Sequence, residues 1–125
     1  MNIKNITRLM DFIRVLPHVS VHEQNPDYDS FDMGLHNYPK TKRPACIIGW
    51  ARHFALRDGI LDLYGDPDVY AWLGLGGVQI HNLAYPFLVG TGIESLWEIE
   101  PEQAASVLQH LLDTGEVDWS ILSSK

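Results

Sequence analysis

The segment PACIIGWARHFALR, residues 44–57, constrains the fold more than any other part of the chain. Its large apolar side chains recur at steps of three and four, which is the spacing of one face of an α-helix. Pro44 suits the first turn of this helix, and Gly59 is its expected end. The predicted buried face consists of Cys46, Ile47, Trp50, Ala51, Phe54 and Ala55.

Gly49 stands in the interior of this predicted helix. A glycine at such a position costs about 1 kcal/mol of helix propensity relative to alanine. Glycine also leaves space that any Cβ atom would fill. We therefore expect another part of the backbone to approach the helix closely at Gly49.

Two further segments show helical spacing. In residues 3–16 apolar side chains recur at steps of three and four, and Pro17 ends the pattern because proline cannot continue a helix. Residues 101–113 begin with a proline, which suits a first helical turn, and Gly115 is the expected C-terminal stop. The segment around Trp119 is expected to fold back onto the core.

The glycine-rich middle of the chain predicts one short helix and leaves its continuation open. Asp66 followed by Pro67 suits the N-cap and first position of a helix over 67–73. The glycines of the following LGLGG stretch end that helix. Residues 78–93 fit either short strands or helical turns.

These patterns predict a mainly α, compact single-domain fold over residues 1–125. A short β element in 18–22 or 78–90 remains open. About four helices are expected, near residues 3–16, 45–57, 67–73 and 101–113. The predicted core contains Leu9, Ile13, Cys46, Ile47, Trp50, Phe54, Leu73, Leu108 and Leu111.

The stretch Val69–Ile93 has no charged residue over 25 positions, which is long enough to test as a membrane span. It also contains five glycines, Pro86 and a polar group made of Gln79, His81 and Asn82. The clustering of these glycines with a proline and three polar side chains favours short elements with tight connections over one continuous membrane helix. We therefore expect buried core elements here and no membrane partner.

Charge is divided unevenly along the chain, whose formal net charge is −7. Residues 1–57 hold eight Lys or Arg and five acidic residues, whereas residues 58–124 hold no Lys or Arg and eleven acidic residues. An acidic half of this kind repels nucleic acid and attracts basic surfaces. We expect a protein partner with a basic surface and no direct nucleic-acid binding. Ordinary solvation of an acidic protein is the alternative.

Cys46 is the single cysteine of the chain, so neither an intramolecular disulfide nor a cysteine-rich zinc site can form. The N-terminus lacks the apolar stretch and cleavage site of a signal peptide. Both features predict a cytoplasmic protein in a reducing compartment. No sequence pattern indicates a cofactor, and the pair His18 and His22 has no third ligand at a spacing typical of a metal site.

Several stretches carry a resemblance to known proteins: Phe31-Asp32-Met33, Pro44–Ala51, Leu73-Gly74-Leu75, Glu102–Ala105 and Gly115–Trp119. Together they resemble a group of small uncharacterised bacterial, prophage and phage proteins with a C-G-T-x-A-C-x-A-G-W-A core motif. The resemblance implies a shared fold and an accessory genetic setting, without an activity. Thr41 stands where the group has its first cysteine, so a function of a cysteine pair cannot operate here.

The sequence thus favours a non-enzymatic binding protein, an accessory or modulator of the phage-inhibitor type, whose acidic half docks on a basic partner. The candidate partner-binding residues are Trp72, Glu94, Trp97, Glu98, Glu100 and Glu102. No catalytic residue is proposed in this interpretation. The alternative is a small-molecule-binding or enzymatic domain, whose pocket would be lined by His36, Cys46, His53 and His81. A third hypothesis is self-association.

Overall fold

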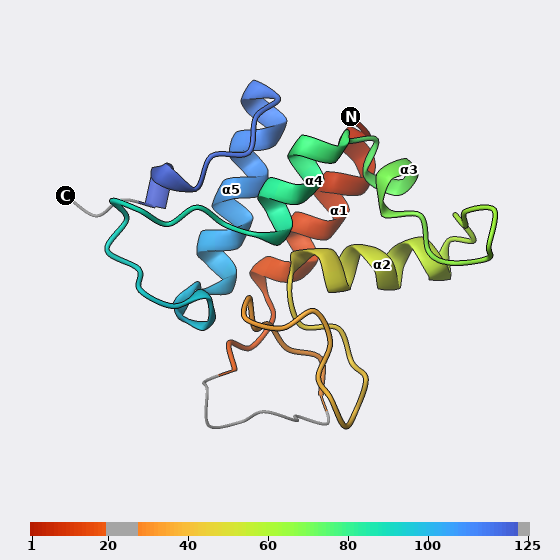
Figure 1. The fold of residues 1–125 in the computed structure, drawn as a ribbon, viewed down its shortest axis with the longest axis horizontal. Helices are drawn as coiled ribbons and strands as arrows, with labels where there is room; N and C mark the ends of the chain where they lie inside the picture. Colours follow the sequence, from red (N-terminus) through yellow and green to blue (C-terminus); the bar gives the residue numbers. More distant parts are fainter. Residues whose placement is uncertain (20–27, 123–125) are drawn as a thin grey trace.

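The computed structural model describes residues 1–19 and 28–122, and it confirms the mainly α fold (Figure 1). This part of the chain holds five α-helices and two short 3₁₀ helices. The α-helices are α1 (Ile3–Arg14), α2 (Ile47–Arg57), α3 (Val69–Leu73), α4 (Gly77–Ala84) and α5 (Pro101–Thr114). The 3₁₀ helices are η1 (Leu96–Glu98) and η2 (Trp119–Leu122).

The core lies between α1, α2 and α5. The most extensive contact of any two helices is that between α1 and α5, and α2 packs against α1, α3 and α4. In Figure 1 α2 crosses beneath the lower end of α1, and long loops extend below it. All nine predicted core residues are buried. Apolar burial of this kind supplies most of the driving force for folding. The helical periodicity therefore identified the buried faces correctly.

The helix ends agree with the prediction in part. Pro101 opens α5, and Gly115 ends it in the left-handed conformation, as expected. Pro44 does not open α2, because it lies in an isolated bridge with Asn37, and Cys46 is the N-cap instead. The Sγ atom of Cys46 accepts a hydrogen bond from Gly49 N at 3.4 Å.

The short helix α3 begins two residues later than predicted. Its N-cap is Asp68, whose Oδ1 accepts a hydrogen bond from Ala71 N at 3.0 Å. The predicted cap, Asp66, belongs to the preceding loop, where its carbonyl oxygen accepts from Asp62 N. The Asp66-Pro67 pair, which resembled a helix start, therefore belongs to the loop before α3.

Of the two alternatives for residues 78–90, short strands or helical turns, the structure shows the helical one, because α4 occupies Gly77–Ala84. A side chain from this helix explains its stability: Gln79 accepts from Gly76 N through Oε1 and donates through Nε2 to Gly115 O at 2.7 Å. In the region 18–22, His18 forms a bridge with Phe31, and residues 20–22 lie outside the described part of the chain.

The structure confirms the close approach of another backbone segment to the helix at Gly49. A Cβ atom built on Gly49 would collide with the carbonyl oxygen of His36. That oxygen accepts a hydrogen bond from Ala45 N at 3.0 Å, which fixes its position. The loop before α2 therefore lies directly on the helix at this point.

The C-terminal segment folds back onto the core as predicted. Trp119 is buried, and its indole Nε1 donates a hydrogen bond to Asn82 O at 2.8 Å. The contact joins η2 to α4. No helix within residues 1–19 and 28–122 is long and apolar enough to span a bilayer, including the two in the uncharged stretch.

Candidate functional site

The two tryptophans predicted to anchor a partner lie in different environments. Trp72 is 1% exposed, its Nε1 donates to Asp58 Oδ2 at 2.8 Å, and its ring stacks on Phe54. The ring of Trp72 is therefore a core element that a partner cannot reach, and its assignment to a docking surface is corrected. Trp97 is 38% exposed, and its carbonyl oxygen lies 2.8 Å from His18 Nε2.

The four predicted glutamates gather where η1 meets the start of α5. Glu94, Glu100 and Glu102 are exposed. Glu98 is half-buried, and its carboxylate accepts hydrogen bonds from the backbone of Glu94 and Ser95 at 3.2 and 2.7 Å. Glu102 also lies 3.5 Å from Arg14. This surface is acidic as expected. However, the carboxylate of Glu98 binds the backbone of its own turn, and that of Glu102 pairs with Arg14.

A second acidic surface, which the sequence reasoning missed, is the loop between α2 and α3, residues 58–68. It projects from the body at the right-hand side of Figure 1. Leu63 and Tyr64 at its tip are 99% and 90% exposed. A large apolar pair held fully in water has no role in the core, and such residues mark interaction sites when other apolar groups lie beside them. Nearby exposed apolar side chains are Leu56, Ile60, Leu61 and Tyr70.

The tip of this loop is held by its own hydrogen bonds. Asp62 Oδ1 accepts from Tyr64 N at 2.8 Å and from Asp66 N at 3.1 Å. Asp62 N donates to Asp66 O, and Gly65 N donates to Asp62 O. Gly65 has φ = 82°, a left-handed conformation that favours glycine. These hydrogen bonds restrict the backbone that carries Leu63 and Tyr64, which reduces the loss of backbone entropy on binding.

The base of the loop is also tied to the body. Asp68 N donates to Ile60 O, and a bridge joins Leu61 to Pro67. Asp58 Oδ2 accepts from Trp72 and from Arg8, both at 2.8 Å. The hydrogen bond from Trp72, followed by that from Arg8, lowers the pKa of Asp58. Asp58 therefore joins the loop to the core.

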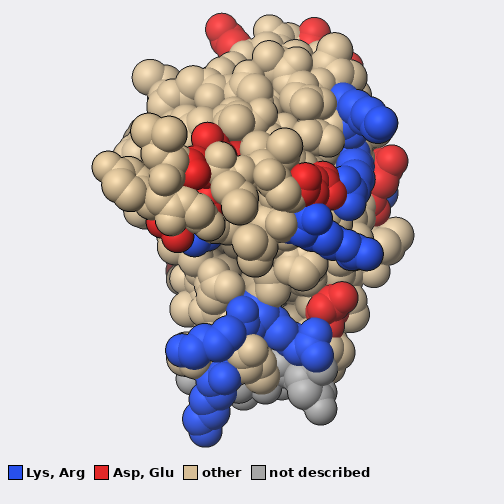
Figure 2. All heavy atoms as spheres, turned by 90° about the vertical axis from the view of Figure 1, so that its right-hand side faces the viewer, with Lys and Arg blue, Asp and Glu red and all other residues tan. Residues whose placement is uncertain are grey.

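The charged residues of the loop itself are all acidic. The 58–68 loop contains four aspartates and no Lys or Arg. The side chains of Asp58, Asp62 and Asp68 are engaged in the contacts above, and that of Asp66 is exposed. Figure 2 looks at this side of the molecule and shows carboxylates among uncharged atoms, with Lys and Arg at its lower end and also along its right-hand edge. The loop therefore combines an apolar tip with an acidic border.

The sequence signal for this surface is the run ILDLYGDPD, in which apolar residues stand among turn-forming residues. Apolar residues in a turn are buried when the loop folds back onto the body and exposed when it projects. The structure shows the second outcome, which the residue order alone does not specify.

The alternative pocket is only partly assembled. His36 Nδ1 lies 3.2 Å from Cys46 Sγ, so these two residues do meet. Cys46 is 1% exposed, and burial raises the pKa of its thiol. A reactive cysteine requires an accessible thiolate, so this pair lacks the properties of a nucleophile and its base.

The other two residues of that pocket have separate ring partners. His53 packs edge-on against Trp50 with ring centroids 5.4 Å apart, and His81 lies 5.0 Å from the ring of Tyr85. Both histidines are exposed. Among the described residues no group of three or more His, Cys, Asp or Glu is placed to hold a metal ion. His22 lies outside that part of the chain.

Comparison of the chain with protein-family models, with curated proteins and with solved structures finds no match. The resemblance to small bacterial and phage proteins therefore stays a prediction, and arguments about function depend on the geometry described above.

Proposed function

We propose that this protein acts by binding, without catalysis, and that its 58–68 loop docks on a protein partner. The partner surface has an apolar pocket that accepts Leu63 and Tyr64, with Lys or Arg at its border. The observation that carries the proposal is the near-complete exposure of these two side chains on a braced loop. In keeping with the resemblance, the protein would be an accessory or modulator of the phage-inhibitor type.

The apolar tip accounts for affinity. Complete burial of a leucine side chain contributes about 1.5–3 kcal/mol. Tyrosine is among the residues enriched at the centres of protein interfaces. A stable interface covers about 800 Å² per partner, which is more than two side chains supply. The exposed Ile60 within the loop, with Leu56 and Tyr70 on either side of it in the chain, would extend the contact.

The acidic border accounts for the choice of partner. Complementary charge raises the association rate and disfavours partners of the same sign. The 58–68 loop and the glutamates around η1 belong to the same half of the chain, which lacks Lys and Arg from residue 58 to residue 124. The exposed carboxylate of Asp66 at the tip would therefore face the Lys or Arg at the border of the partner's pocket.

The test compares partner capture by three tagged proteins from a lysate of the source organism. These are the wild type, the double variant Leu63→Ser with Tyr64→Ser, and Val78→Ser as the matched control. Val78 is also exposed and apolar, but it lies on α4. The proposal predicts one stoichiometric partner for the wild type and the control, reduced by the double variant and by added salt.

Two results would count against the proposal. Equal capture by the double variant would show that the tip is not the docking element. Absence of a stoichiometric partner at low salt would contradict docking on a protein of that organism. Recovery of untagged copies of the chain alone would favour the third hypothesis, self-association, over a foreign partner.

A further inference from the structure

We propose that a hollow on the outer face of α2 binds a compact anion of the phosphate-monoester class. The hollow has a volume of about 210 Å³ and lies between α2 and the hairpin of residues 37–44. We call it the Arg52 hollow. Its cationic or hydrogen-bonding wall is formed by Lys42, Arg52 and His53, and its apolar wall by Pro44, Leu56 and Pro67.

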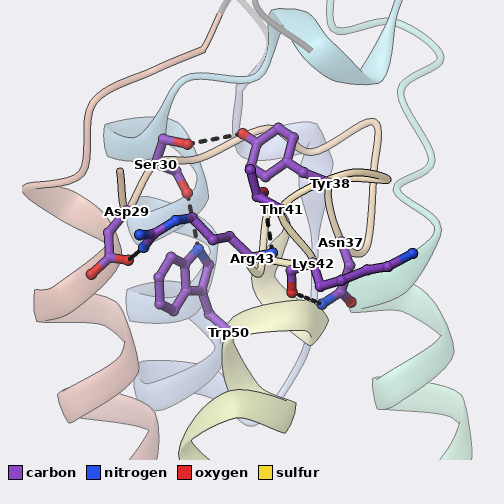
Figure 3. Close-up of polar contacts among 8 residues, drawn as sticks. All are labelled: Asp29, Ser30, Asn37, Tyr38, Thr41, Lys42, Arg43 and Trp50. Atoms are coloured by element: carbon purple, nitrogen blue, oxygen red, sulfur yellow. Dashed lines mark hydrogen bonds and ion pairs between the residues drawn. The ribbon is translucent and has the colours of Figure 1, made fainter. Parts of the chain in front are cut away.

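The hairpin of residues 37–44 is a closed structure, shown in Figure 3. Its two ends meet in a bridge between Asn37 and Pro44. Tyr38 N donates to Arg43 O, and Lys42 N donates to Tyr38 O, both at 2.9 Å. These bonds fix the course of the backbone on both sides of Lys42.

Lys42 occupies the left-handed region with φ = 61°, which non-glycine residues seldom adopt. Its carbonyl oxygen accepts a hydrogen bond from Asn37 Nδ2 at 3.1 Å, which holds this conformation. Unfavourable backbone conformations persist where the surroundings determine them, and they concentrate at ligand sites. Figure 3 shows the side chains of Lys42 and Arg43 leaving the hairpin on opposite sides.

The hairpin is anchored to the core from below. Tyr38 is buried, and its hydroxyl accepts a hydrogen bond from Ser30 Oγ at 3.0 Å. Burial raises the pKa of Tyr38 to about 12, so the phenol stays neutral. Trp50 Nε1 donates to Ser30 O from the buried side of α2. The position of Lys42 relative to α2 is thus set by packed side chains.

The cations of this region differ in whether they already have a partner. Arg43 pairs with Asp29 at 2.9 Å. Lys42 and Arg52 take part in none of the ion pairs found among residues 1–19 and 28–122, which use Arg8, Arg14 and Arg43. The lining of the Arg52 hollow includes no carboxylate. An anion there would supply the charge partner that both side chains lack.

The chemistry of the wall indicates the class of anion. A guanidinium group binds phosphate through two parallel hydrogen bonds, and a lysine adds a point charge. Asp62 and Asp66 line the neighbouring hollow on the other side of Arg52. Their charges oppose an extended polyanion such as nucleic acid, but a compact anion can bind Arg52 from the side of Lys42. The apolar wall suits the organic part of a monoester.

The test is a titration with inorganic phosphate and with phenyl phosphate, followed by amide and side-chain NMR signals at constant ionic strength. The reporters are the Asn37 side-chain amide, Gly49 N–H and the Arg52 guanidinium. The proteins are the wild type, Lys42→Gln, Arg52→Gln and the control Arg57→Gln. Arg57 is an exposed arginine on the same helix that does not line the hollow.

The proposal predicts saturable shifts in the wild type and about a tenfold weaker Kd in Arg52→Gln and Lys42→Gln, because each loses a charge-assisted hydrogen bond. Arg57→Gln should match the wild type, and phenyl phosphate should bind more tightly than phosphate. Non-saturable shifts, or equal weakening in Arg57→Gln, would overturn the site. The double variant at Leu63 and Tyr64 should bind phosphate normally, so this proposal fails or stands independently of the docking loop.

Discussion

The carbonyl oxygen of His36 lies so close to Gly49 that a Cβ atom there would collide with it. The oxygen cannot move aside at low cost, because it accepts the hydrogen bond from Ala45 N that closes the loop before α2. This contact joins the helix at the centre of the fold to the segment that carries His36 and the hairpin of residues 37–44. One backbone contact thus positions both the core helix and the Arg52 hollow.

The first prediction concerns the substitution Gly49→Ala. Alanine would gain about 1 kcal/mol of helix propensity, but collision with a fixed backbone oxygen typically costs more, about 1–3 kcal/mol or above. We expect a lower urea midpoint than that of the wild type. Gly77→Ala is the matched control, because nothing lies within 4 Å of its Cβ position at the start of α4. Equal stability of the two variants would contradict the close approach.

The second prediction concerns the dependence of stability on pH through Asp58. Hydrogen bonds from Trp72 and Arg8 lower the pKa of this carboxylate in the folded state. A lowered folded pKa contributes stability above the unfolded value, near pH 4, and that contribution is lost as pH falls through the folded pKa. Asp58→Asn should therefore be less stable than the wild type at neutral pH, and the difference should shrink in acid.

Urea unfolding at a series of pH values measures this difference. Asp113→Asn is the control, since Asp113 is an exposed aspartate whose side chain accepts a hydrogen bond from Gln109 on its own helix. A gap between wild type and Asp58→Asn that stays constant down to the most acidic pH would show that Asp58 is not held as the structure indicates.

The third prediction concerns the reactivity of Cys46. Burial raises the pKa of the thiol and removes it from solvent, so alkylation by iodoacetamide near neutral pH should be slow in the folded protein. The urea-unfolded chain is the internal reference, because it contains the same single thiol. Mass spectrometry at timed intervals measures both rates. If the folded chain is labelled as fast as the unfolded chain, Cys46 is accessible, and this result would favour the alternative pocket.

The fourth prediction separates the two tryptophans. Trp72→Ala removes a fully buried ring and its hydrogen bond to Asp58, and it should destabilise the fold by about 3–5 kcal/mol. Trp97→Ala removes a ring that is partly in solvent, and it should cost less than half as much. Thermal or urea unfolding of both variants measures the contrast. Similar losses in the two would contradict the different burial of the rings.

The helical cores could be predicted from the sequence because apolar spacing is a local signal. Leu9 and Ile13 in α1, and Leu108 and Leu111 in α5, recur at helical intervals, and all four are buried. The helix α4 could not be predicted in this way. It contains few large apolar residues, and Gln79 holds it through contacts with Gly76 and the distant Gly115.

The candidate site was predicted less well than the fold. The acidic half was identified correctly as a stretch without basic residues, but Trp72 was assigned to its surface. A helix of five residues gives too little periodicity to show which face is buried, and the partner that settles it, Asp58, lies fourteen positions away. The exposure of Leu63 and Tyr64 depends on a loop that projects from the body, which residue order does not specify.

Photo-crosslinking from the loop tip identifies the surface that contacts the partner. A benzoyl-phenylalanine is placed at position 64 or, as a control, at position 78, and the full-length protein is irradiated with its captured partner. If the loop docks through its tip, position 64 crosslinks to an apolar pocket bordered by Lys or Arg, and position 78 does not. A partner that crosslinks from position 78 and not from position 64 would contradict docking through Leu63 and Tyr64.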